Sequence, residues 1–370
     1  MTTKLNWGII GTGNISSTFA KGIINSTTGQ LTSISSRTKA SADTFGDKFN
    51  VPQRYDSYQE LLKDPHVQAV YIGTPHPTHA TIAIRCAEAG KHILCEKPIT
   101  LNHSDTMAVV EAAIANGVFL MEAFMYRCHP QTQKLIELLK QNVIGDVRLI
   151  KATFGFHCDF DADSRLFSQK LGGGGILDVG CYPVSFARLV AGIIQGKEYD
   201  EPIAVKGFSH LGATGVDEWA SALLKFKNGL IAEVSTSTQL NQDNTAVVYG
   251  SKGSIHIASP WLVAKDGGTW TIEVRKNGED SQLISGDERL SLYSIEADTV
   301  AEAIHAGKSE TQAMSWGDTF GNMRTLDAWR REIGLTYEEE AIGAKRPPLN
   351  GRALHPSSTN NMRYARIKGL

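Results

Sequence analysis

A lysine stands between a glutamate and a proline where a short apolar run ends, in the stretch LCEKPIT at residues 94–100. A proline ring disfavours helical backbone at the preceding residue, so Lys97 is expected on a short, stiff turn at the end of a strand. Its ammonium group is then either an ordinary solvated charge or a charge placed for chemistry.

A second set of reactive side chains occurs in GGGGILDVGCYPVSFARL at residues 172–189. Asp178 and Tyr182 are spaced i, i+4, so on a helix they share one face. The four glycines at 172–175 would let the chain pass close to a ligand. A tyrosine hydroxyl titrates near ~10, too high for a base at neutral pH, but a cation within ~4–6 Å can lower that pKa by ~1–3 units. Lys97 is the candidate cation.

A glycine-rich turn near the N-terminus has the pattern of a nucleotide site. Gly11 permits a tight turn, and Gly13 lets a pyrophosphate approach the backbone. Asn14 and Ile15 then open a helix whose N-terminus offers free N–H groups and a partial positive charge. The third motif position is Ser16 rather than glycine. The motif is weak alone, but here it joins a predicted strand to a predicted helix, which is its required context.

The end of the second predicted strand indicates which nucleotide binds. An NAD site usually has an acidic residue there, ~20 residues after the glycines. This sequence reads ISSRTKAS at residues 34–41, and its next acid is Asp43. The hydroxyl of Ser36 and the guanidinium of Arg37 suit a 2′-phosphate, which a carboxylate would repel. NADP is therefore predicted in preference to NAD.

Strand-like and helix-like segments alternate over residues 1–125, predicted to form an NADP-binding domain. Such alternation predicts an α/β fold with a parallel sheet covered on both faces, of the Rossmann type. The predicted strands are 5–10, 31–36, 67–73, 92–95 and 118–123, and the clearest helices are 77–90 and 102–117.

The pattern changes after Met125, and residues 126–345 predict an α+β domain for substrate binding and dimerisation. A helix at 130–142 and a strand at 147–156 precede the glycine run and another helix. Strands then follow, joined by turn signals at 228–229, 251–253, 266–267 and 277–278, and the last helix spans about 315–333. These features predict an open, mostly antiparallel sheet. The tail, 346–370, is expected to pack on the body or on a partner.

Composition limits the possible functions. The chain has 370 residues, 41 % hydrophobic and 21 % charged, with a net charge of -2, so a soluble protein of two domains is expected. This balance gives no electrostatic case for binding nucleic acid or a membrane surface. The N-terminus lacks a secretory pattern, and no stretch approaches the ~18 apolar residues of a membrane span. Five cysteines without a CxxC pair indicate reduced thiols in the cytoplasm. Without an HExxH or a clustered Cys/His signature, no structural metal is expected.

Five segments in register resemble one known family. GIIGTGNIS, TPHPTHA, CEKPIT, MEAFMYRCHP and GGGGILDVGCYPVSFARL occur in the order found in the Gfo/Idh/MocA oxidoreductases. The chain looks closest to the branch with dimeric dihydrodiol dehydrogenase, NADP-dependent xylose dehydrogenase and glucose-fructose oxidoreductase. The resemblance covers nearly the whole chain. It implies a Rossmann domain, then a domain whose open sheet often mediates homodimer formation.

The resemblance also implies the roles of particular residues. The lysine of the Glu-Lys-Pro motif, Lys97, would be catalytic beside the nicotinamide, with Asp178 and Tyr182 on the substrate side. The remaining residues are expected to line the two binding sites. Those on the cofactor side are Thr74, Pro75, His79, Glu96 and Arg127, and those in the substrate pocket are Phe156 and Arg165.

The expected reaction is hydride transfer between nicotinamide C4 and a hydroxyl or carbonyl carbon of a sugar or polyol-like substrate. Tyr182 would act as general acid and base, and Lys97 would tune it and polarise the C–O bond. Asp178 would orient the substrate or pair with Lys97. Some members of the branch use the lysine as main proton donor, so the division of roles stays open. Met125 replaces a tryptophan of the dihydrodiol dehydrogenases, which argues against an aromatic diol.

Two alternatives stay open. One is a redox-neutral enzyme that keeps its cofactor while passing hydride between two sugars, although such members carry an exported N-terminal arm that is not recognisable here. The other is a non-enzymatic NADP-sensing regulator on the same fold. Such regulators tend to lose the lysine or the tyrosine, whereas Lys97, Asp178 and Tyr182 are all present.

Overall fold

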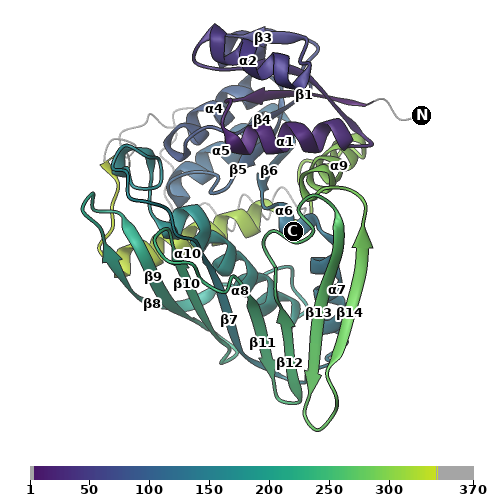
Figure 1. The fold of residues 1–370 in the computed structure, drawn as a ribbon, viewed down its shortest axis with the longest axis vertical. Coiled ribbons are helices and arrows are strands. Elements are labelled where there is room, and N and C mark those ends of the chain that lie inside the picture. Colours follow the sequence, from purple (N-terminus) through teal and green to yellow (C-terminus); the bar gives the residue numbers. More distant parts are fainter. Residues whose placement is uncertain (1–3, 339, 341–370) are drawn as a thin grey trace.

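The computed structural model describes residues 4–338 and 340 and contains two sheets, each with its own helices (Figure 1). The first sheet has six parallel strands in the order β3-β2-β1-β4-β5-β6. This is the strand order of a doubly wound dinucleotide-binding fold. The predicted parallel α/β fold is confirmed.

The elements of the first sheet follow the predicted alternation. Its strands are β1 (Leu5–Ile10), β2 (Gly29–Ser35), β3 (Gln53–Tyr55), β4 (Ala69–Ile72), β5 (His92–Glu96) and β6 (Leu120–Ala123). Its helices are α1 (Asn14–Asn25), α2 (Lys39–Phe49), α3 (Tyr58–Lys63), α4 (His76–Glu88) and α5 (His103–Asn116). The edge strand β3 was not predicted, because three residues are too few to show a period of two.

Helix α5 illustrates why the local sequence suffices for these boundaries. The Asn102 side chain accepts a hydrogen bond from the Asp105 N–H at 2.8 Å, which satisfies a donor of the first turn. At the other end Gly117 adopts the left-handed conformation, with φ of 64°, that stops a helix. Both ends agree with the predicted range of 102–117.

The second sheet has eight strands in the order β14-β13-β12-β11-β7-β10-β9-β8. They are β7 (Val147–Gly155), β8 (Pro202–Leu211), β9 (Asp217–Phe226), β10 (Ile231–Ser237), β11 (Ala246–Gly250), β12 (Gly253–Ile257), β13 (Gly268–Lys276) and β14 (Gln282–Glu288). Strands β7 and β10 pair in parallel, and the other neighbours are antiparallel. The predicted open, mostly antiparallel sheet is confirmed.

Three of the four predicted turns join neighbouring antiparallel strands: 228–229, 251–253 and 277–278. The turn at 266–267 instead ends a longer connection between β12 and β13. That connection is drawn into the core by the buried side chains of Trp261 and Val263. A tight hairpin there would leave both side chains in water.

Helices cover one face of the second sheet. They are α7 (Pro130–Lys140), α8 (Cys181–Ile193) and α10 (Trp316–Glu332), and α6 (Met125–Cys128) leads into them. The predicted last helix is therefore present as α10, and the Ser315 side chain caps its start.

Helix α9 (Leu292–His305) follows the second sheet in the chain but packs on α1 of the first unit (Figure 1). The Asp298 carboxylate accepts hydrogen bonds from the residues that end α1, among them the Thr27 hydroxyl at 2.9 Å. The Ser294 hydroxyl donates to the Gly22 carbonyl at 2.8 Å. A division at residue 125 thus separates the two sheets but not all the helices that cover them. The predicted tail, 346–370, lies outside the described residues.

The expectation that no stretch has the length and apolarity of a membrane span needs one correction. Within the described ranges one helical segment, Gln169–Ile193, passes that test, with a mean hydropathy of 1.4. Its apolar window is buried inside the protein, where the segment carries Asp178 and Tyr182 and packs on β7 and β10. A core helix of a soluble protein has the same properties.

Candidate active site

Lys97 directly follows β5 and reaches across to the second unit. Its Nζ donates a hydrogen bond of 2.7 Å to the main-chain carbonyl of Asp178 and lies 3.7 Å from the Asp178 carboxylate. The same ammonium sits 5.3 Å from the centroid of the Tyr182 ring. The structure thus brings the three predicted catalytic residues into one group, at the edge of the first sheet where parallel strands end.

Asp178 lies in a π-helical turn, Ile176–Gly180, that leads directly into α8. Arg165 Nη1 is 2.9 Å from its Oδ1. Burial alone would raise the pKa of Asp178, but the charges of Lys97 and Arg165 outweigh it and hold the pKa at about 2. The carboxylate is therefore ionised at neutral pH. The wider π turn also means that Asp178 and Tyr182 do not share an ordinary α-helical face.

Tyr182 is only 3 % exposed, and its hydroxyl lies 3.4 Å from the sulfur of Met125. Burial raises its pKa well above the ordinary value. The aromatic rings around it belong to Phe124, Tyr126, Phe154 and Trp261. The prediction of a lowered pKa is therefore wrong, and the Lys97 ammonium lies over the ring face, as cations prefer.

Asp217, at the start of β9, supports the glycine run and was not predicted. It is fully buried, and its Oδ2 accepts a hydrogen bond of 2.7 Å from the Ile176 N–H at the start of the π turn. Its Oδ1 points at Gly174, where an added Cβ would clash with it, so the run must be glycine here. Burial raises the pKa of Asp217 to about 7. A single aspartate in an alternating strand pattern carries no signal for this role.

The nucleotide turn has the geometry that its sequence predicts. Gly11 adopts φ of +100°, and a Cβ there would lie 2.8 Å from the Gly73 carbonyl oxygen. At Gly13 an added Cβ would meet nothing within 4 Å, and α1 starts without a side-chain cap. The open space and the uncapped N–H groups fit a dinucleotide pyrophosphate. Ser16, in the third glycine's place, is buried, and its Oγ lies 3.5 Å from the carbonyl of Gly73.

Ser36 and Arg37, the two residues predicted to bind a 2′-phosphate, follow the end of β2. Ser36 lies 3.1 Å from the Thr12 hydroxyl of the glycine turn. Arg37 is exposed and makes no ion pair with any residue the structure describes. Lys39, by contrast, pairs with Asp43 at 3.0 Å. Among the described residues, the Arg37 guanidinium is thus uncommitted, and it follows the serine that contacts the glycine turn, as a 2′-phosphate site requires.

Other predicted cofactor residues hold the turn that carries Lys97. The two ring nitrogens of buried His79 lie 2.7 Å from the Thr74 carbonyl and 3.0 Å from the Pro98 carbonyl. Pro75 precedes α4. Glu96 is buried and accepts a hydrogen bond of 2.5 Å from the Tyr71 hydroxyl, and burial raises its pKa. These contacts join the ends of β4 and β5.

Comparison with known proteins identifies the family. Residues 5–124 match the oxidoreductase family with an NAD-binding Rossmann fold, and residues 132–256 match the Gfo/Idh/MocA C-terminal domain. The chain belongs to this family. It is a nicotinamide-dependent oxidoreductase.

Relatives and solved structures agree with this assignment. Trans-1,2-dihydrobenzene-1,2-diol dehydrogenase from Mus musculus is 34 % identical over 91 % of this chain and 99 % of its own length. The enzyme of the same name from Xenopus tropicalis is 34 % identical over 91 % and 100 %. An aldose-aldose oxidoreductase structure from Caulobacter crescentus, 23 % identical, covers 90 % of this chain and 98 % of its own, with a TM-score of 0.79. A 3-ketoreductase structure from Actinomadura kijaniata with NADP and TDP-benzene, 24 % identical, has the same coverage and TM-score. At these identities the structures show the fold.

The three remaining predicted residues of the oxidoreductase lie in different environments. Arg165 has a side chain that is 51 % exposed, so it stands at the mouth of the site. Phe156 follows β7, half-buried, with its N–H bound to the Ser237 carbonyl at 3.0 Å. Arg127 is buried, pairs with Asp318 and donates to the Ala313 carbonyl, so its guanidinium takes part in a core ion pair, and its cofactor contact stays a prediction.

Proposed function

We propose that this oxidoreductase uses NADP to transfer hydride between nicotinamide C4 and a hydroxyl or carbonyl carbon of a sugar or polyol-like substrate. The observation that carries the proposal is the hydrogen bond of Lys97 Nζ to the Asp178 carbonyl, 2.7 Å long, at the carboxyl edge of the sheet that also bears the glycine turn. Ligands of open parallel sheets bind along this edge. The names of the relatives support a substrate with secondary hydroxyl groups.

Lys97 is the proposed proton donor to the substrate oxygen during reduction, and the acceptor during oxidation. When bound, the nicotinamide supplies or accepts the hydride. An ammonium has three N–H donors, and one of them already holds the Asp178 carbonyl. The others can point to the substrate, since the Lys97 side chain keeps 13 % exposure. Asp178 and Arg165 would orient the neighbouring substrate hydroxyls.

Tyr182 has a smaller part in this proposal than the sequence predicts. Its hydroxyl is buried next to the Met125 sulfur, and its pKa is raised rather than lowered. Its ring face instead supports the Lys97 ammonium. Between the two roles that the resemblance leaves open, this arrangement favours the lysine as proton donor and the tyrosine as a residue that positions it.

NADP is proposed over NAD because of Ser36 and Arg37. A guanidinium that pairs with no acid in the part of the chain that the structure describes, next in sequence to a serine hydroxyl, suits a 2′-phosphate through charge-assisted hydrogen bonds. The structural relative from Actinomadura kijaniata is solved with NADP, which is consistent with this preference.

A homodimer through the uncovered face of the second sheet is proposed as well. The face opposite α8 exposes large apolar side chains on β8 and β9, among them Phe208 at 88 %, Leu223 and Trp219. Such a patch marks an association surface. Light scattering should give twice the chain mass, and Phe208→Glu should shift the species to one chain mass. A monomeric parent protein would refute the dimer.

Nicotinamide absorbance during turnover tests the proposed function. Purified protein is mixed with NADP or NAD, oxidised or reduced, and a panel of aldoses, anhydro-sugars, inositols and dihydrodiols. Turnover with NADP and one sugar or polyol class, lost in Lys97→Met, is expected. Silence across the panel with nicotinamide still bound would favour the redox-neutral or the sensor alternative.

A further inference from the structure

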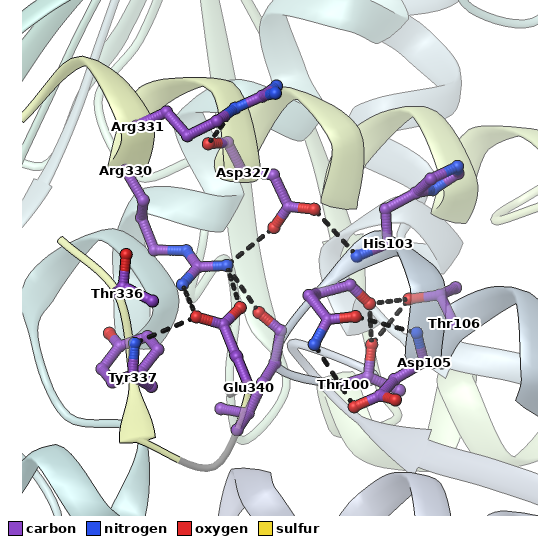
Figure 2. A network of polar contacts seen from close by, with 12 residues as sticks. Thr100, His103, Asp105, Thr106, Asp327, Arg330, Arg331, Thr336, Tyr337 and Glu340 are labelled. Carbon is purple, nitrogen blue, oxygen red and sulfur yellow. Dashed lines mark hydrogen bonds and ion pairs between the residues drawn. The ribbon is translucent and has the colours of Figure 1, made fainter. Parts of the chain in front are cut away.

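A buried network beside the site centres on Arg330 of α10, whose side chain is 4 % exposed (Figure 2). Its Nη2 donates to the Leu101 carbonyl at 2.9 Å and also contacts the carboxylates of Asp327 and Glu340, each at 2.7 Å. Its Nη1 makes a further hydrogen bond of 2.8 Å to Glu340. A guanidinium fork with several charge-assisted hydrogen bonds is held in a fixed orientation.

Tyr337 joins this network to the glycine run. Its ring lies 5.0 Å from the Arg330 guanidinium, and its N–H donates to Glu340 at 3.0 Å. Its hydroxyl, fully buried, donates a hydrogen bond of 2.5 Å to the carbonyl of Gly173. Tyr337 is therefore fixed at both ends, by Arg330 and Glu340 on one side and by Gly173 on the other.

The two carbonyls that this pair holds belong to the two segments that carry the catalytic group. Leu101 follows Lys97 on the loop after β5, and Gly173 precedes Asp178 on the segment that enters the π turn. Asp327 strengthens the first attachment, because its carboxylate accepts a hydrogen bond of 2.9 Å from the His103 N–H at the start of α5. Arg330 and Tyr337 thus connect the loop that carries Lys97 to the segment that carries Asp178.

We propose that Arg330 and Tyr337 are positioning residues that set the separation between Lys97 Nζ and Asp178, and through it the rate of proton transfer. The inference rests on the proposed function. The two catalytic residues come from units that meet across the site, so the hydrogen bond between them needs a support that spans both. Small errors matter there, because misplacement by ~1 Å can cost ~10²-fold in rate.

The test replaces Tyr337 by phenylalanine, which removes the hydroxyl and keeps the ring beside Arg330. We expect kcat to fall about tenfold or more, while the Kd for NADP changes less than about twofold, because the nucleotide turn is untouched. The matched control is Tyr55→Phe, which removes a tyrosine hydroxyl bonded to Asp64 at 3.1 Å at the far edge of the first sheet. The control should leave kcat unchanged.

A second readout does not need turnover. The rate at which an amine-acetylating reagent modifies Lys97, followed by peptide mass spectrometry, should rise several-fold in Tyr337→Phe, because the Nζ is held less firmly on the Asp178 carbonyl. Modification of exposed Lys39 in the same sample provides the reference. If the parent protein turns over no substrate, the proposed function fails while this measurement still tests the positioning role.

Arg330→Lys is the second variant, in case Tyr337→Phe does not fold, since lysine keeps the charge but cannot hold Leu101 and Glu340 together. The same loss of kcat and the same faster labelling of Lys97 are expected. Variants that fold and bind NADP, yet match Tyr55→Phe in both kcat and Lys97 labelling, would overturn the proposal.

Discussion

The nucleotide side and the substrate side of the site are built in different ways. On the nucleotide side, Gly11 and Gly13 and the uncapped start of α1 present backbone groups that are close in sequence. On the substrate side, Lys97 and Asp178 meet from units far apart in the chain, and each is nearly buried. The first side needs only a correct local turn, whereas the second depends on the packing of the whole molecule. Mutations should therefore act locally on one side and cooperatively on the other.

Lys97→Met should show the largest effect. Loss of the proton donor is expected to lower kcat by about a thousandfold, because a general acid contributes ~10²–10⁴-fold. NADP affinity should stay nearly unchanged, as measured by fluorescence titration. The control is Lys91→Met, which removes a buried lysine that is likewise bonded to main-chain carbonyls, those of Asp64 and Val67. If both variants lost turnover equally, Lys97 would have no special role.

Asp217→Asn should change how stability depends on pH. The folded pKa is raised to about 7, so the folded protein holds a proton there that the unfolded chain releases near pH ~4. The contribution of this bound proton to the free energy of unfolding is fully present below pH ~4 and is lost as pH rises through 7. The free energy of unfolding of the parent should therefore fall across this window by a few kcal/mol, on the order of ~1.4 kcal/mol per pH unit, relative to the variant.

Urea denaturation at several pH values measures that difference. Asp298→Asn is the matched control, because burial would raise the pKa of Asp298 but hydrogen bonds from Ser26, Thr28 and Thr27 lower it overall. Its stabilising contribution is fully present above pH ~4 and is lost as pH falls below that value, so the parent-minus-variant difference should stay constant between pH ~4 and 7 and fall only at lower pH. Equal slopes for the two variants would contradict the assignment for Asp217.

Arg37→Ala should show a moderate effect confined to the cofactor. Loss of an exposed guanidinium is expected to weaken NADP binding about tenfold and leave NAD binding unchanged, because only NADP has the 2′-phosphate. Calorimetric titration with both nucleotides checks this, and the effect should shrink at high salt. Lys39→Ala is the control, since Lys39 is paired with Asp43. A similar loss for NAD would mean that Arg37 does not read the phosphate.

Tyr182→Phe should show the smallest effect. If Lys97 is the proton donor, removing a hydroxyl whose hydrogen bond among the described residues goes to a sulfur should lower kcat less than about fivefold, because the ring that supports the ammonium remains. Steady-state kinetics with the substrate found in the panel checks this. A loss of kcat as large as that of Lys97→Met would indicate instead that Tyr182 is the general acid and base.

The same contrast explains what could be predicted from sequence. The strands, the caps of α5 and the glycine turn depend on neighbours in the chain, so their periodicity and residue types suffice. The motifs predict that Lys97, Asp178 and Tyr182 belong to one site, but they do not predict how the three side chains are arranged. The π turn at Asp178, the core ion pair of Arg127 and the support by Asp217 all depend on contacts between distant segments. No local pattern encodes these.

The return of α9 to α1 has a consequence for how the protein is made. A ribosome releases the whole first sheet long before Ser294 and Asp298 emerge to bond Gly22 and the residues that end α1. During synthesis the nucleotide-binding unit therefore lacks the contacts of α9 while the second sheet folds. Contacts of such long sequence separation form late and slowly. A nascent chain stalled before residue 292 should accordingly be more sensitive to protease around Ser26 than the finished protein.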